Sequence, residues 1–289
     1  MASYILYRLL GWLAPHIPPR LGYGLFARLG DLFYRLDASG RQAVQDNLRH
    51  VLGPAVPAGV LDEKVRATFR MQAYNYFDLF RLPAMSAEEV AARLNVEGWE
   101  NLETAIARGK GVVLVSAHLG NVDVVMQILG LRGVNATMVA EHLKPEELYR
   151  YVTRIRAGHG TTIIPVDGSL RVLFRALRAG GVVVLALDRD VTHSGVEIEF
   201  FGEPAKLPDG YARLARRTGS LVVPGFGLRL PDHQLRVRLE PALDVPQTDD
   251  RAVDVRAVMR KALSVAERYI AEHPEQWIMF RPIWREGGQ

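Results

Sequence analysis

A histidine and an acid, with four residues between them, follow a stretch that is rich in valine. Residues 111–115 read GVVLV, which is typical of a buried strand. His118 follows this stretch, and Asp123 lies five positions further on. Because open α/β sheets usually bind ligands at the carboxyl ends of their strands, His118 is a candidate for catalysis.

The spacing decides whether the two side chains can form a pair. On a continuous helix five residues turn the chain by roughly 500°, so His118 and Asp123 would point about 140° apart. They can meet only if the chain still turns after His118, which Gly120 and Asn121 permit. In that arrangement Asp123 accepts a hydrogen bond from one imidazole nitrogen and leaves the other free as a general base. The alternative is a loop in which both residues only cap the next helix.

Other polar side chains follow predicted strands and could gather at the same edge of a parallel sheet. Arginine suits an oxyanion or a phosphate group. The alternative is structural, because arginine at a helix end interacts favourably with the dipole and two acids can bracket Arg189 in a surface salt bridge. The candidates are Glu141 after the strand 136–140, Arg154 and Arg156 near the end of the helix 145–158, and Asp188 and Asp190 after the strand 182–187.

The composition excludes several classes of protein. The 289 residues are 48% hydrophobic and 24% charged, which is ordinary for a globular protein. The absence of cysteine excludes disulfides and thiolate metal sites. The net charge of +4 and the balance of basic and acidic residues argue against a nucleic-acid partner. The sequence has no uninterrupted apolar run of 18 residues and no secretory signal pattern, so we expect neither a transmembrane helix nor secretion.

Several catalytic motifs are missing. The sequence contains no G-x-S-x-G elbow, no phosphate-binding Walker loop, no G-x-G-x-x-G after a strand and no histidine pair with zinc spacing. We therefore expect neither a metal nor a cofactor. A base without a protein nucleophile fits a reaction in which a hydroxyl of the substrate attacks.

The hydrophobic pattern predicts an α/β fold, with a mostly parallel central sheet flanked by helices and a helical N-terminal cap. We expect one domain over residues 1–289. A helix capped by Asp62 should run to Leu82, and Ser86 with Glu89 should form a capping box. Strands are predicted at 94–98, 111–116, 136–140, 161–165, 182–187, 196–200, 221–227 and 235–240, and helices at 122–132, 145–158, 168–179, 208–218 and 250–273.

The first 40 residues are rich in aliphatic, aromatic and arginine side chains. Two predicted helices, 4–14 and 20–36, carry Arg8, Arg20, Arg28 and Arg35 among their apolar residues. This density is typical of helices that lie on a bilayer with arginine among the headgroups, and we expect Leu9, Trp12 and Phe26 to face the membrane. The alternative is a helical hairpin packed on the core.

Four motifs in order resemble the bacterial lipid A biosynthesis acyltransferases, and still more their relatives that acylate phosphatidylinositol mannosides. The resemblance covers nearly the whole chain. Besides His118-x4-Asp123, it rests on RQAVQDNLRHVLG at 41–53, ALDRDVTHSGVEIEFFGEPAKLPDG at 186–210 and HPEQWIMFRPIWRE at 273–286. The sequence departs from many lipid A enzymes in having Asp rather than Glu at 123, which leaves the acceptor open.

The resemblance implies an acyltransferase that moves a fatty acyl chain from acyl-CoA or acyl-carrier protein to a hydroxyl of a membrane glycolipid or lysolipid. His118 would be the base and Asp123 its partner, with Arg156 or backbone amides stabilising the oxyanion. Glu141, Arg154, Asp188 and Asp190 would contact substrate. The enzyme would be peripheral, on the cytoplasmic face of the cell membrane. The alternatives are a lipid ester or thioester hydrolase with the same His–Asp pair and a non-catalytic lipid-binding protein.

Overall fold

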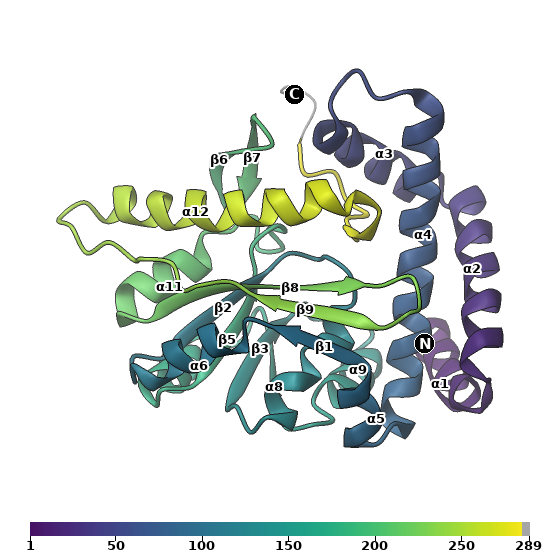
Figure 1. The fold of residues 1–289 in the computed structure, drawn as a ribbon, viewed down its shortest axis with the longest axis horizontal. Coiled ribbons are helices and arrows are strands. Elements are labelled where there is room, and N and C mark those ends of the chain that lie inside the picture. Colours follow the sequence, from purple (N-terminus) through teal and green to yellow (C-terminus); the bar gives the residue numbers. More distant parts are fainter. Residues whose placement is uncertain (285–289) are drawn as a thin grey trace.

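A seven-stranded sheet forms the centre of the computed structural model, which describes residues 1–284 (Figure 1). Its strand order is β1-β9-β8-β2-β5-β3-β4. Strands β8, β2, β5, β3 and β4 are parallel to one another, whereas β9 is antiparallel to β8 and parallel to β1. This architecture confirms the predicted α/β fold with a mostly parallel sheet. The strands are β1 (Leu94–Glu97), β2 (Val112–Ser116), β3 (Ala136–Ala140), β4 (Thr162–Pro165), β5 (Val182–Ala186), β8 (Leu221–Arg229) and β9 (Leu235–Leu239).

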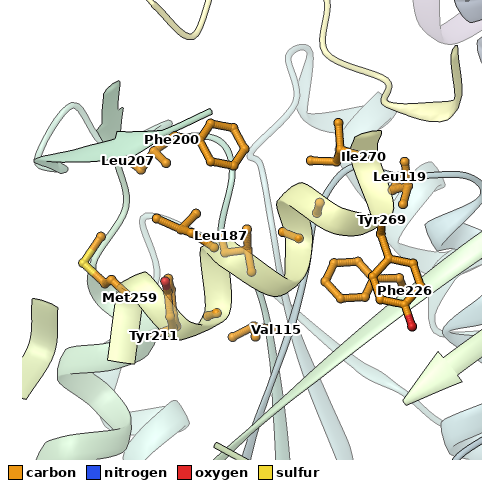
Figure 2. Close-up of a cluster of buried hydrophobic side chains, with 14 of the residues drawn as sticks. Val115, Leu119, Leu187, Phe200, Leu207, Tyr211, Phe226, Met259, Tyr269 and Ile270 are labelled. Carbon is orange, nitrogen blue, oxygen red and sulfur yellow. The ribbon is translucent and has the colours of Figure 1, made fainter. Parts of the chain in front are cut away.

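Both faces of the sheet are buried. Alternate side chains of a strand point to opposite faces, so Val113 and Val115 of β2 belong to one core and Val112 and Leu114 to another. The first core lies under α10 (Leu170–Arg178), α11 (Gly210–Thr218) and α12 (Arg251–Glu272). Figure 2 shows Val115 beside α12 and the ring of Tyr269, from α12, against Phe226. The second lies against α6 (Trp99–Ala107), α7 (Val122–Val125) and α8 (Gln127–Leu131). Burial on both faces explains the continuous apolar runs of the central strands.

The remaining helices lie beyond the sheet edges or connect the strands. The long helix α4 stands beside the sheet, with α1, α2 and α3 packed around it (Figure 1). These helices are α1 (Ala2–Leu13), α2 (Pro19–Leu36), α3 (Ala38–Leu52), α4 (Ala58–Arg81), α5 (Ala87–Ala92) and α9 (Glu146–Arg156), with 3-10 turns η1 (Ala14–His16), η2 (Leu82–Ala84) and η3 (Pro274–Gln276).

Several local predictions are confirmed and others are wrong. The capping box of Ser86 and Glu89 is present. Asp62 is not a cap, because α4 begins four residues earlier at Ala58 and the Asp62 carboxylate instead accepts a hydrogen bond from the Tyr34 hydroxyl. The predicted helix 122–132 is divided into α7 and α8. The predicted strand 196–200 is present as β6 (Val196–Phe200), but it lies outside the central sheet. It pairs with an unpredicted strand, β7 (Glu203–Leu207), in a separate hairpin.

Helices α1 and α2 contain features of both predicted arrangements. On α2, Tyr23 and Phe26 are buried against Phe77 of α4, so Phe26, at 4% exposure, does not face outward as predicted. Trp12 and Phe33, by contrast, are 68% and 56% exposed. Over residues 1–284, none of the helices combines the length and apolar character needed to cross a membrane.

Candidate active site

Strand β2 brings His118 to the carboxyl end of the parallel strands. After the fully buried β2, Ala117 leads to His118, whose side chain is 35% exposed. The chain then turns through Gly120, which has a φ of +62°. A Cβ atom there would lie 2.2 Å from the carbonyl oxygen of Gly227, so the turn needs glycine both for its backbone conformation and for its close approach to β8. The turn after His118 is therefore as predicted.

The partner of His118 is Asp188, which follows the neighbouring strand β5. Ser116 of β2 pairs with Ala186 of β5, so His118 and Asp188 each lie two residues beyond the same point of the register. The Nδ1 atom of His118 lies 2.8 Å from Oδ1 of Asp188. The backbone N–H of His118 donates to Oδ2 of the same carboxylate, also at 2.8 Å. Two contacts to one rigid carboxylate fix both the position and the ring orientation of the histidine.

Asp188 is held as a carboxylate although it is completely buried. Burial on its own would raise its pKa. The neighbouring His118 and hydrogen bonds from its ring and backbone, together with one from Trp277, outweigh burial and hold the pKa of Asp188 below its usual value. The indole Nε1 of Trp277 donates to Oδ2 at 2.8 Å. The alternative in which Asp188 forms a surface salt bridge with Arg189 is therefore wrong.

The C-terminal segment closes over the loop that carries His118. The N–H of Ile278 donates to the carbonyl of His118 at 2.7 Å, and the N–H of Gly120 donates to the carbonyl of Gln276 at 2.9 Å. Leu119 and Trp277 form an antiparallel bridge. The motif at His118 and the C-terminal motif, which are distant in the sequence, are thus in direct contact. The last two residues of the C-terminal motif, 285–286, lie outside the described residues.

Asp123 does not pair with His118. The carboxylate of Asp123 instead accepts a hydrogen bond from Nε of Arg156 at 2.6 Å, with Nη2 3.5 Å from its second oxygen. Asp123 lies in the first turn of α7 and Arg156 in the last turn of α9, and both side chains are partly buried. The helix that begins after the turn points Asp123 toward α9, which corrects the predicted His118–Asp123 contact.

The three remaining candidates lie in different surroundings. Glu141, after β3, forms an ion pair of 2.8 Å with Arg189. Asp190 accepts hydrogen bonds from Thr192 and Gly195 and so organises the turn before β6. Arg154 is exposed on α9, and no hydrogen bond or ion pair within residues 1–284 joins it to the other candidates.

This geometry leaves one atom of the histidine available for chemistry. An ionised carboxylate only accepts hydrogen bonds, so the proton of a neutral His118 lies on Nδ1 and Nε2 keeps its lone pair. A histidine oriented in this way by a buried acid can act as a general base. Within the described part of the chain no cluster of three His, Asp or Glu side chains could hold a metal ion.

Comparison with known proteins shows the family of the chain. The family model described as bacterial lipid A biosynthesis acyltransferase matches residues 1–286. The chain belongs to this family. It is an acyltransferase, and its relatives function in lipid biosynthesis.

Relatives within the family carry two kinds of name. A phosphatidylinositol mannoside acyltransferase of Mycobacterium tuberculosis is 34% identical over 95% of this chain and 86% of its own length. The protein with the same name in Mycolicibacterium smegmatis is 32% identical over 95% of this chain and 89% of its own. A lipid A biosynthesis acyltransferase of Haemophilus influenzae is 22% identical over 93% of this chain and 83% of its own.

Solved structures also match the chain, and one of them is an acyltransferase by its title. The 1-acyl-sn-glycerophosphate acyltransferase PlsC from Thermotoga maritima aligns with a TM-score of 0.39 and 14% identity, over 86% of this chain and 97% of that protein.

Sequence reasoning missed part of this candidate site. Trp277 stands in a quoted motif, yet nothing local predicts that its indole bonds Asp188. Asn75, Asp78 and Arg229, which surround the turn at Gly120, carry no motif. The signal in the sequence that could have identified them is their position among apolar neighbours in α4 and β8.

Proposed function

We propose that this acyltransferase moves a fatty acyl chain from a thioester to a hydroxyl of a membrane glycolipid or lysolipid, with His118 as the general base. The observation that carries the proposal is the contact of His118 Nδ1 with the buried carboxylate of Asp188. In the neutral ring this contact leaves the Nε2 lone pair free on a partly exposed side chain, where a substrate hydroxyl can reach it.

The reaction needs no protein nucleophile. Nε2 of His118 takes the proton of the acceptor hydroxyl while the oxygen attacks the thioester carbonyl carbon. The tetrahedral intermediate then collapses, the carbon–sulfur bond breaks, and the departing thiolate takes the proton from the imidazolium. Asp188 stabilises the imidazolium without becoming protonated.

In this proposal Asp123 and Arg156 act as a pair that stabilises the oxyanion. Arg156 uses Nε and Nη2 for Asp123, which fixes the plane of the guanidinium beside the first turn of α7. A fixed guanidinium can stabilise the oxyanion of the intermediate. Asp123 then acts through Arg156. Glu141 and Arg189 form a second fixed ion pair for substrate contact, whereas Arg154, Asp188 and Asp190 need not touch substrate directly.

The acceptor we favour is a phosphatidylinositol mannoside. The relatives with this name are 32–34% identical to the chain, whereas the Haemophilus lipid A enzyme is 22% identical. The donor is acyl-CoA or acyl-carrier protein, because both present a thioester that the mechanism can use. No metal or cofactor takes part in the proposed steps.

We further propose that residues 1–40 hold the enzyme at the cytoplasmic face of the cell membrane, within a single domain over the whole chain. Arg8, Arg20, Arg28 and Arg35 are all exposed and can contact lipid phosphates. The exposed apolar side chains of α1 and α2 include Ile5, Leu6, Leu9, Trp12, Leu13, Leu21, Leu25, Leu32, Phe33 and Leu36.

The test is turnover of labelled acyl-CoA and acyl-carrier protein with and without a phosphatidylinositol mannoside acceptor. We expect consumption of one donor to depend on the acceptor and the label to appear in the acceptor as an ester. Release of free fatty acid at the same rate without acceptor would favour a hydrolase. Bound lipid with no turnover of either donor would favour a lipid-binding protein.

A further inference from the structure

Asp78 is a completely buried carboxylate in α4 that accepts four hydrogen bonds. Its Oδ1 atom accepts from the Tyr23 hydroxyl at 2.6 Å and from Arg93 Nη2 at 2.8 Å. Its Oδ2 atom accepts from Arg229 Nη2 at 2.6 Å and from Asn121 Nδ2 at 3.0 Å. These donors come from α2, β8 and two loops, so Asp78 joins the N-terminal helices to the sheet.

The bond from Asn121 reaches the middle of the loop between His118 and Asp123. Asn121 is 1% exposed, and its Oδ1 atom accepts from the N–H of Val124 at 3.1 Å, which caps α7. Because Nδ2 donates to Asp78, the amide is held in the one orientation that presents Oδ1 to the helix. Asp78 thereby fixes the start of the helix that carries Asp123.

A second hydrogen bond from the same face of α4 fixes Gly120, the residue before Asn121. Asn75 lies one turn before Asp78, and its Nδ2 atom donates to the carbonyl of Gly120 at 2.6 Å. Arg229 Nη2 joins the two, donating to Asn75 Oδ1 at 2.9 Å and to Asp78 Oδ2 at 2.6 Å. Gly120 and Asn121 are therefore held by neighbouring side chains of one helix.

The charge of Asp78 is maintained by its neighbours. Burial favours its neutral form, but the guanidinium groups of Arg229 and Arg93 outweigh burial and hold the pKa of Asp78 below its usual value. In the part of the chain that the structure describes, Asp78 makes no hydrogen bond to His118, Asp123 or Asp188. Its influence on those residues must pass through Asn121 and the turn.

We infer that Asp78 is a positioning residue for acyl transfer, which holds the turn between His118 and the Asp123–Arg156 pair through Asn121. The inference rests on the proposed function, because it assigns a purpose to the spacing of those groups. A shift of about 1 Å between reacting groups can cost roughly 100-fold in rate. The contact of Tyr23 with Asp78 also places α2 against this network from its buried side.

The test changes the donor of the central contact and, separately, the neighbouring donor Asn75. Asn121→Asp keeps an oxygen for the Val124 N–H but places a second carboxylate beside Asp78. We expect kcat to fall roughly 10–100-fold, with KM for the thioester unchanged. Asn75→Ala removes the donor to the Gly120 carbonyl without adding charge, and it leaves the four donors of Asp78 in place. We expect it to lower kcat as well, with KM for the thioester unchanged, because the turn loses its other contact with α4.

Three outcomes separate this inference from its alternatives. Wild-type kcat in a folded Asn121→Asp protein would overturn it. If Asn121→Asp does not fold, Asn75→Ala alone tests the inference. A lower kcat with unchanged KM then supports the inference, and a wild-type kcat refutes it. His118→Ala in the same assay tests the proposed function separately, because a wild-type rate there refutes the mechanism whatever the Asp78 variants do.

Discussion

The carboxylate of Asp188 contacts His118 twice, at the ring nitrogen Nδ1 and at the backbone nitrogen, with both distances 2.8 Å. The same oxygen that accepts from the backbone also accepts from the Trp277 indole. This arrangement gives the two carboxylate oxygens different functions. One anchors the loop to the C-terminal segment, and the other sets the tautomer of the histidine.

Asp188→Asn should separate these two functions. Because two N–H groups point at Oδ2, the amide oxygen will occupy that place and the amide nitrogen will face Nδ1 of His118. The imidazole proton then moves to Nε2, and the base is lost. We expect turnover to fall roughly 10²–10⁴-fold. Initial rates with saturating thioester, together with the thermal midpoint of each protein, check this. A folded variant with wild-type turnover would show that Asp188 only supports the loop.

Asp123 and Arg156 should behave as one unit. Arg156→Lys keeps the charge but loses the planar fork that meets both oxygens of Asp123, and we expect turnover to fall roughly 10²-fold. If Asp123 acts through Arg156, the double variant Asp123→Asn with Arg156→Lys should be about as slow as the slower single variant. The kinetic cycle measures this directly. Effects that multiply would instead indicate that Asp123 acts on substrate or on His118 independently.

The exposed side chains of α1 and α2 should bind anionic membranes. Changing Trp12, Leu21 and Phe33 to Ser removes apolar side chains that are 68%, 68% and 56% exposed, so the fold should survive. We expect the triple variant to lose flotation with phosphatidylglycerol–phosphatidylcholine vesicles. Leu170→Ser, which changes an equally exposed side chain on α10, is the control and should still float.

Salt gives a second measurement of the same surface. Added salt should weaken vesicle binding only in part, because it screens the arginine contacts and leaves apolar burial intact. Failure of the intact protein to float with anionic vesicles would contradict the anchor. Loss of binding by Leu170→Ser to the same extent would show that the effect is not specific to α1 and α2.

His142 should have a measurable effect on the pH dependence of stability. Hydrogen bonds to Glu146 and then Asp167 raise its pKa above the usual value of 6.5. The protonated ring therefore stabilises the folded loop at pH below about 6.5, and this contribution is lost as the pH rises through the higher folded pKa. The thermal midpoint of His142→Gln should lie below that of the wild type at pH 5.5 and approach it at alkaline pH. A difference that grows with pH would contradict this assignment.

Local sequence pattern was sufficient for the strands of the sheet but not for their pairing. The valine-rich runs of β2 and β5 predict two buried strands. Between them in the chain lie β3 and β4, yet the structure pairs β2 directly with β5. This register cannot be read from either strand alone, so the sequence predicts substrate contact for Asp188 and not a hydrogen bond with His118. Asp123 is the predicted partner of His118 because it is near in sequence and because the family resemblance implies the pair.

The buried network around Asp78 shows a second limit. Asp78 lies in an amphipathic helix where a charge is usually solvated, and its four donors come from positions 23, 93, 121 and 229. Each contact depends on how whole elements pack, so no local spacing predicts it. The prediction also confuses the exposed and buried sides of α2. It places Phe26 outward, although Phe26 packs on Phe77.

The most direct test of the mechanism is the rate of acyl transfer by His118→Ala from labelled thioester to the glycolipid acceptor. We predict a loss of roughly 10²–10⁴-fold with unchanged donor binding, because the base is removed and the fold is not. His142→Gln, which changes an exposed histidine, should transfer the acyl chain at the wild-type rate in the same assay. A folded His118→Ala protein that transfers acyl chains at nearly the wild-type rate would contradict the account.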